Sequence, residues 1–153
     1  MTTAIPPHLA PYMRTVPARI FRAALPDADP LQPSEAERRA TAAGTGGVYC
    51  AVEPDTCRAE VPHLPNFKLY EVAVAGSIPV LDLVAYCQGE GVDPQQCYAG
   101  TPSLSKTIHS FFGQGVPAMS WKSQKQPDGT CVVLLVDHIP NLREVISYQP
   151  ATN

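Results

Sequence analysis

The chain has 153 residues, of which 44% are hydrophobic and 16% charged, and its formal net charge is −3. This composition is typical of a single globular domain and excludes an intrinsically disordered chain. Because the charge is slightly negative and no run of Lys or Arg occurs, bulk electrostatics give no basis for binding nucleic acid or an anionic membrane.

Cysteine and histidine usage argues against a disulfide framework and a metal site. The five cysteines are odd in number and form no Cys-x-x-Cys pair, and the four histidines show no metal-ligand spacing. No apolar run is long enough to span a bilayer, and the N-terminus lacks the pattern of a signal peptide. We therefore expect reduced thiols, no metal, and a cytoplasmic site of action.

The N-terminal region contains an arm and a first strand. Residues 1–17 include four prolines and little periodicity, so they are predicted to form an arm on the surface, and the domain itself is placed at 18–153. Residues 18–24 are predicted to form a strand. Side-chain alternation would put Ile20 and Arg22 on one face of that strand.

The next segment is predicted to contain a helix, a strand and a second helix. A capping-box pattern predicts a helix over 34–43, and a glycine-rich lead-in occupies 44–47. A short buried strand is expected at 48–52. After a turn, a helix is predicted to start at Thr56 with Asp55 as its N-cap.

This central stretch is the part of the chain that suggests chemistry. Tyr49 and Ala51 would share one face of the strand, and Glu60 would lie on the helix that returns beside it. An aromatic ring and a carboxylate would then face a common cleft. Such a pair suits the glycosidic bond of a nucleotide.

The second half is predicted from periodicity and turn residues. A strand is expected at 66–75, the apolar run at 80–83 is typical of a strand edge or a helix start, and one helical turn could follow Asp93. The clearest helix is 101–113, where apolar residues recur at helical spacing.

The C-terminal part is predicted to be mainly extended. Strands are expected at 118–124, 131–136 and 142–148, with a turn at 127–129. The sum is five or six short strands interrupted by two or three helices without strict β-α-β alternation. This favours an α+β fold in a single compact domain.

The sequence contains no strong local catalytic motif. The glycine lead-in precedes a strand, whereas a phosphate loop follows one, and no Gly-x-Ser-x-Gly element occurs. A cysteine nucleophile paired with a histidine remains an alternative, because the two residues of such a pair meet in the folded structure and need not be close in sequence. What remains is a dispersed set of Arg22, Tyr49, Glu60 and Ser123, each of which alone has a structural interpretation.

The order of these residues resembles the RES-domain toxins, a family named for an Arg, a Glu and a Ser. Four short motifs carry the resemblance: Ile-Phe-Arg-Ala at 20–23, Tyr-x-Ala at 49–51 with a helix to Glu60, Ile-Pro-Val-Leu-Asp-Leu at 78–83, and Trp-Lys-Ser-Gln at 121–124 before an Asp-Gly turn. The resemblance covers residues 18 to about 136. The family's second arginine motif is not evident, so Arg38 or Arg39 is a candidate substitute, and Cys131 stands where many members carry an asparagine.

The resemblance implies an ADP-ribosyltransferase-like fold and destruction of NAD+ by hydrolysis or phosphorolysis, with NAD+ as substrate and no metal. Glu60 would stabilise the ribose cation, and Arg22 would hold the pyrophosphate. Tyr49 would stack on nicotinamide, with Trp121 as a further pocket wall. Ser123 would orient a ribose hydroxyl or the carboxamide.

The resemblance also implies partners and leaves other functions open. An antitoxin or immunity protein encoded nearby would neutralise the toxin, a homodimer is compatible, and the toxin could act after delivery into another cell. The alternatives are ADP-ribosyl transfer to a protein and a non-catalytic binding module with the same fold.

A second serine competes with Ser123 for the site. In an extended strand, Ser120 and Ser123 point to opposite faces, and Trp121 shares the face of Ser123. We therefore predict that Ser123 enters the cleft and that Ser120 is structural.

Overall fold

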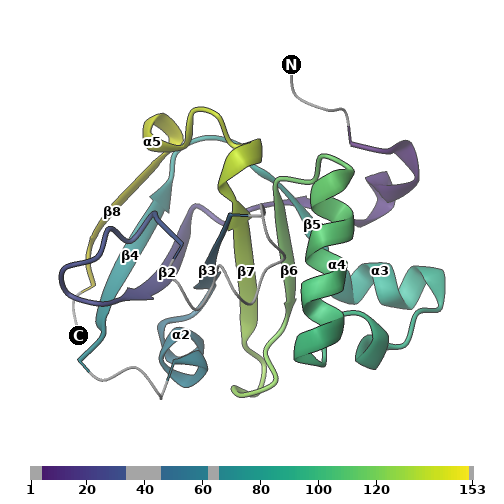
Figure 1. Cartoon of the computed structure of the whole chain (residues 1–153), viewed down its shortest axis with the longest axis horizontal. Coiled ribbons are helices and arrows are strands. Elements are labelled where there is room, and N and C mark those ends of the chain that lie inside the picture. The colour runs from purple at the N-terminus through teal and green to yellow at the C-terminus, as the bar shows by residue number, and fades with distance from the viewer. Residues whose placement is uncertain (1–4, 34–45, 62–65, 152–153) are drawn as a thin grey trace.

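The computed structural model describes residues 5–33, 46–61 and 66–151. These residues form one eight-stranded sheet in the order β1-β5-β6-β7-β3-β2-β4-β8 (Figure 1). Its strands are β1 (Met13–Thr15), β2 (Arg19–Ala24), β3 (Gly47–Ala51), β4 (Lys68–Val74), β5 (Pro79–Asp82), β6 (Ala118–Lys122), β7 (Thr130–Leu135) and β8 (Ile146–Pro150). The strands pair antiparallel except for β5 and β6, which are parallel.

Helices lie between the strands along the chain. They are η1 (Pro7–Tyr12), α2 (Pro54–Glu60), α3 (Leu83–Glu90), η2 (Pro94–Gln96), α4 (Thr101–Gly113), η3 (Val136–His138) and α5 (Leu142–Val145). Figure 1 shows α3 and α4 together beside β6, and α2 apart from them near β3. The predicted α+β fold is confirmed. No helix of the described residues is long and apolar enough to cross a membrane.

Elements with a clear local pattern agree with prediction. The strands expected at 18–24, 48–52, 66–75, 118–124 and 131–136 correspond to β2, β3, β4, β6 and β7, and the helix over 101–113 is α4. On α4, Ile108 and Phe111 are buried in the core as the apolar periodicity requires. The helical turn expected after Asp93 is η2.

The start of α2 differs from the prediction. The helix begins at Pro54 with Glu53 in the N-cap position, so Asp55 lies inside the first turn. Proline suits this first position because its ring fixes a helical φ and its missing N–H would have no partner there. Glu53 instead accepts a hydrogen bond from the backbone N–H of Thr130 at 3.0 Å, which ties the helix start to β7.

The ambiguous run at 80–83 is both a strand and a helix start. β5 ends at Asp82, whose carboxylate accepts the N–H of Ala85 at 3.1 Å and so caps α3. The helix ends at Gly91, which has φ of 67°, a conformation that glycine adopts without steric cost.

The last strand is shorter than predicted. The predicted N-terminal arm contributes a strand and buried side chains to the fold. Residues 142–145 form the helical turn α5, and β8 begins only at Ile146. Within the predicted arm, β1 pairs with β5 at the sheet edge, and Leu9 and Val16 are buried. The helix predicted over 34–43, residues 44 and 45 of the glycine lead-in, and both substitute arginines lie outside the described residues.

Side-chain alternation separates the core into two large clusters. Val133 on β7 packs with Met119, Ile108 and residues of α3 in one cluster, whereas its neighbour Val132 packs with Ile20 in the other. A third, small cluster joins α2 to β2 and β3 through Cys57, Ala23 and Ala51. This small cluster positions the C-terminal end of α2 against the middle of the sheet.

Candidate active site

A small pocket lies where α2 meets the sheet. Its cavity volume is about 80 Å³. The residues that line it come from β2, β3, α2, β6 and β7: Arg22, Ala23, Tyr49, Cys50, Ala51, Cys57, Glu60, Val61, Trp121 and Cys131. The structure therefore brings Arg22, Tyr49, Glu60 and Trp121 together in one place, which we call the Glu60 pocket.

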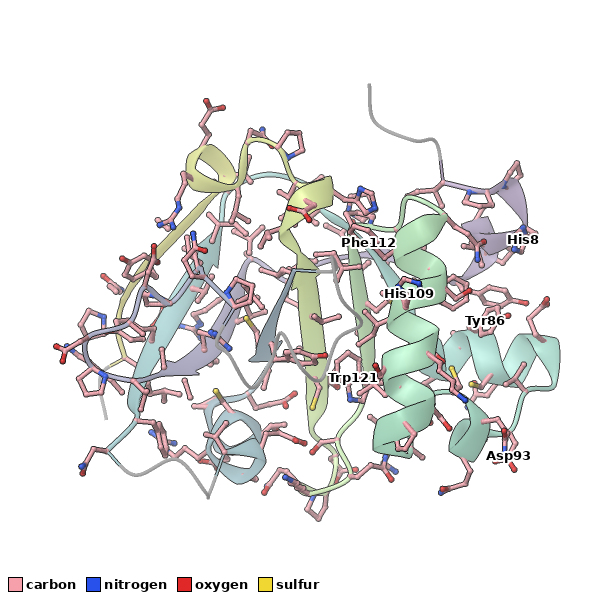
Figure 2. The ribbon with its side chains drawn as sticks, in the orientation of Figure 1. His8, Tyr86, Asp93, His109, Phe112 and Trp121 are labelled. Atoms are coloured by element: carbon pink, nitrogen blue, oxygen red, sulfur yellow. The ribbon has the colours of Figure 1, made fainter. Side chains whose placement is uncertain are left out.

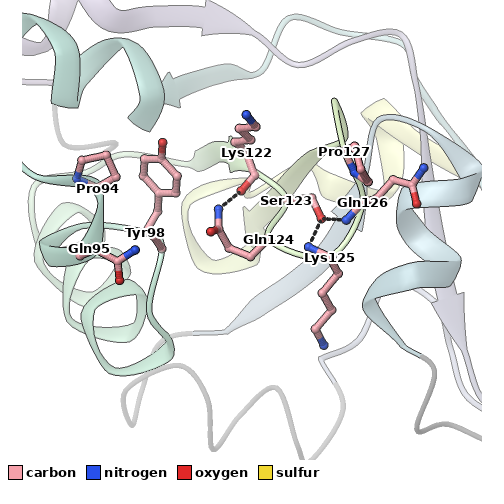
Figure 3. A pocket seen from close by; sticks show the side chains of 10 residues that line it. Pro94, Gln95, Tyr98, Lys122, Ser123, Gln124, Lys125, Gln126 and Pro127 are labelled. Atoms are coloured by element: carbon pink, nitrogen blue, oxygen red, sulfur yellow. Dashed lines mark hydrogen bonds between the residues drawn. The ribbon is translucent and has the colours of Figure 1, made fainter.

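Ser123 reaches this pocket through the carboxylate. Its hydroxyl donates to Glu60 Oε1 at 2.6 Å. The Ser123 hydroxyl oxygen in turn accepts the backbone N–H groups of Lys125 and Gln126, each at 3.1 Å (Figure 3). A serine hydroxyl has one proton and two lone pairs. All three are used, so the proton is directed to Glu60.

Cys131 is a second donor to the same carboxylate oxygen. It lies on β7 opposite Trp121 and Ala51, and its Sγ is 3.3 Å from Glu60 Oε1. Burial, and then the charge of Glu60, raises the pKa of the Cys131 thiol, so the thiol stays protonated and can donate. No pattern in the sequence predicted this contact, which depends on the pairing of β7 with β3 and β6.

Arg22 lies at the edge of the pocket with its guanidinium directed at backbone carbonyls. It is 5% exposed, and it donates to the carbonyl oxygens of Pro30, Gln32 and Tyr49 at 3.0 to 3.2 Å. These bonds join the loop after β2 to β3. The position beside the pocket agrees with the prediction, and the contacts add a structural role that the sequence did not indicate.

Two aromatic rings form one wall of the pocket. Tyr49 and Trp121 contact edge to face, with ring centroids 6.2 Å apart and an interplanar angle of 78°. Trp121 is buried on β6 beside α4 (Figure 2), whereas Tyr49 is half-buried. The more accessible ring is therefore that of Tyr49.

The hairpin that carries Ser123 is held close to α2. Glu53 Oε1 accepts both the Thr56 hydroxyl at 2.7 Å and the Thr130 N–H at 3.0 Å. Gly129 lies against Thr56 so closely that a Cβ at this position would overlap the Thr56 side chain. Glycine at 129 therefore lets the β6–β7 hairpin approach α2 closely.

Ser120 lies elsewhere, as strand alternation predicts. It lines a separate hollow with Asp82 and Asp128, on the other side of the hairpin from Glu60. Ser123, not Ser120, contacts the carboxylate.

A cysteine nucleophile is not supported by this environment. All five cysteines lie among the described residues, and all are buried and outside any disulfide. Burial raises the pKa of Cys57 to about 11, although the nearby Arg22 opposes the shift, so almost no thiolate exists near neutral pH. No described histidine lines the pocket; His8 and His109 lie on η1 and α4 (Figure 2). Among the described residues, no group of His, Cys, Asp or Glu side chains could hold a metal ion.

The chain matches a family model, and its fold is similar to that of a solved structure. A model described as the RES domain matches residues 15–152. The chain is also similar to a solved structure, the crystal structure of the M. tuberculosis MbcT-MbcA toxin-antitoxin complex, with a TM-score of 0.69 and 13% identity. That match covers 95% of this chain and 91% of the other, and at this identity the likeness concerns the fold. No curated protein matches the chain.

Proposed function

The chain belongs to the RES-domain family, and from that premise we propose that it is a toxin that depletes NAD+ by cleaving the bond between nicotinamide and ribose. The observation that carries the proposal is the Glu60 carboxylate, held by two donors in a small pocket beside an accessible aromatic ring.

The required chemistry matches a fixed carboxylate. Nicotinamide leaves from its cationic form as a neutral molecule, so the reaction needs no strong general acid. It needs stabilisation of a ribose that acquires oxocarbenium character, and a preorganised negative charge supplies it. Ser123 and Cys131 both donate to Oε1 of Glu60. Oε2 is then the oxygen that faces a bound ribose or accepts one of its hydroxyls.

The size of the pocket suits one end of the substrate. About 80 Å³ is room for roughly three water molecules at their liquid volume, well below the range of about 300–1,000 Å³ for a whole ligand. Only part of the nicotinamide ring would enter, with the half-buried ring of Tyr49 against it. An aromatic pair of this kind contributes about 1 kcal/mol.

Ser123 has a different role in this proposal from the one predicted for it. Because its single proton is directed to Glu60 and its lone pairs accept two backbone N–H groups, Ser123 acts as a positioning residue for the carboxylate rather than as a ligand for the ribose.

A protein partner is part of the proposal. The similar solved structure is a complex of a toxin with its antitoxin. We therefore propose that this chain, too, is neutralised by a partner protein and that it acts on the NAD+ of the cytoplasm.

Incubation of the purified protein with NAD+, with and without phosphate, tests the function. Nicotinamide should appear by chromatography, and mass spectrometry of the other product identifies the acceptor: ADP-ribose indicates water, phosphorylated ADP-ribose indicates phosphate, and a labelled protein indicates ADP-ribosyl transfer. Release no faster than that of a folded Glu60→Gln variant would contradict the enzymatic proposal and favour a binding module.

A further inference from the structure

A second hollow is lined in part by Ser123, the residue that donates to Glu60 (Figure 3). It lies between the segment that begins with η2 and the turn from β6 to β7, residues 122–127, and its volume is about 420 Å³. This volume falls within the range of ligand-binding pockets, about 300–1,000 Å³. We call it the Lys hollow, after Lys122 and Lys125 in its lining.

Ser123 connects the Lys hollow to the carboxylate. It lines the hollow, and its hydroxyl donates to Glu60 Oε1 at 2.6 Å. A ligand in the hollow is therefore separated from the carboxylate by a single side chain.

The lining of the Lys hollow favours an anion. Lys122 and Lys125 contribute ammonium groups, and Figure 3 shows their side chains leaving the turn in different directions. The amides of Gln95 and Gln126 add donors, the Gln124 amide donates to the Lys122 carbonyl oxygen at 3.0 Å, and no described residue of the lining carries a carboxylate. Phosphate groups are recognised by this combination of cations and N–H donors.

The hollow lined by Ser120 differs from the Lys hollow in its charge. It shares Lys122 but is also lined by Asp82 and Asp128. Two carboxylates oppose a phosphate through like-charge repulsion. Of the two hollows, only the Lys hollow combines a contact with Ser123 and a lining free of acidic side chains among the described residues.

Resting on the proposed function, we propose that the Lys hollow binds the phosphate groups of the dinucleotide, with Lys122 and Lys125 as the cationic contacts. At about 80 Å³ the Glu60 pocket is too small for the dinucleotide, so its phosphates would lie outside it. Arg22 directs three donors at carbonyl oxygens, which leaves a need for further cations near the phosphates. Inorganic phosphate shares this chemistry and is the second source that the experiment separates.

The test uses the double variant Lys122→Gln, Lys125→Gln, which removes both charges from exposed side chains. Lys106→Gln, an exposed lysine of α4 outside the hollow, is the matched control. Nicotinamide release is measured in phosphate-free buffer with NAD+ and with nicotinamide riboside, which carries no phosphate. We expect the KM for NAD+ to rise about tenfold and the preference for NAD+ over the riboside to fall by the same factor, since two exposed charge contacts together have an effect of about this size. The control should retain both values.

Binding measurements separate failure of this site from failure of the proposed function. Calorimetry with ADP-ribose needs no cleavage, so a loss of affinity of about tenfold in the double variant would support the hollow even in an inactive protein. A double variant that changes only the dependence of turnover on added phosphate would assign the same site to inorganic phosphate. Equal ADP-ribose affinity, NAD+ kinetics and phosphate dependence in the double variant and the wild type would overturn the site and leave any observed NAD+ cleavage intact.

Discussion

The Ser123 hydroxyl donates to Glu60 Oε1 at 2.6 Å and thereby joins the residue after β6 to the last residue of α2, which are 63 positions apart in the chain. The backbone N–H groups of Lys125 and Gln126 fix the serine oxygen from the other side. The orientation of the carboxylate therefore depends on the geometry of the β6–β7 turn.

Replacement of Glu60 tests the charge directly. Glu60→Gln keeps an oxygen that can accept from Ser123 and Cys131, so the fold should survive. Nicotinamide release should fall about 10²-fold or more, because removing a preorganised electrostatic group has effects of this size. Turnover is measured with NAD+, and circular dichroism checks the fold. Glu144→Gln, at an exposed position of α5, is the control. Near-normal turnover in a folded Glu60→Gln protein would remove Glu60 from the mechanism.

Removal of the Ser123 hydroxyl should disturb both the carboxylate and the turn. For Ser123→Ala we expect kcat to fall at least about tenfold with little change in KM, since the substrate contacts remain and only the carboxylate loses its support. The free energy of unfolding should fall by about 1–2 kcal/mol, because two N–H groups lose their acceptor. Ser120→Ala is the matched control. A strong loss in Ser120→Ala with a mild effect in Ser123→Ala would reverse the assignment.

Arg22 should tolerate lysine poorly although the charge is retained. The guanidinium donates to three carbonyl oxygens, and an ammonium group on a flexible stem cannot reproduce that fork. We expect Arg22→Lys to lower the free energy of unfolding by about 2–4 kcal/mol, measured by urea denaturation, and to lower NAD+ turnover with it. Arg19→Lys should change stability by less than about 0.5 kcal/mol, because this side chain is 66% exposed in its 3.7 Å contact with Glu71. Equal stability of the two variants would contradict the role of Arg22.

The buried thiols should make the protein less stable in alkali. Burial raises the pKa of Cys57 from its ordinary value of 9.0 to about 11. The unfolded chain therefore ionises first, so the stability that the neutral thiol contributes is complete below about pH 9 and is lost as the pH rises toward 11. The free energy of unfolding should fall with a slope approaching about 1.4 kcal/mol per pH unit for this group.

A variant isolates the contribution of Cys57 from other groups that titrate in alkali. Urea denaturation at intervals from pH 8 to 11 should give a shallower decline for Cys57→Ala than for the wild type. Identical declines in the two proteins would show that Cys57 ionises in the folded state as it does in the unfolded chain.

Local patterns determined much of the secondary structure. The recurrence of Leu104, Ile108 and Phe111 at helical spacing fixed α4, because only a helix places these side chains on one buried face. Alternation along the strand likewise separated Ser120 from Ser123. The site set named from the family resemblance also lies together, with Arg22 and Glu60 lining the same pocket. Their catalytic roles stay predictions.

Other elements depended on contacts that no local pattern contains. The start of α3 depends on the Asp82 cap. The predicted strand at 142–148 begins with a helical turn, in which the Asn141 carbonyl accepts the N–H groups of Glu144 and Val145. Both segments are short, so periodicity alone does not distinguish a strand from a helix there.

The α+β class, the main strands, helix α4 and the residues to examine were predictable from local patterns, whereas the contacts among those residues depend on how distant segments pack. The donation of Cys131 to Glu60 crosses 71 positions and exists because β7 pairs with β3 and β6 in one register while Gly129 lets the hairpin approach α2. A shift of one residue would turn that side chain to the opposite face of the sheet. Hydrogen-bond direction is set by three-dimensional surroundings, and for this reason the role of Ser123 as a support for Glu60 became visible only in the folded chain.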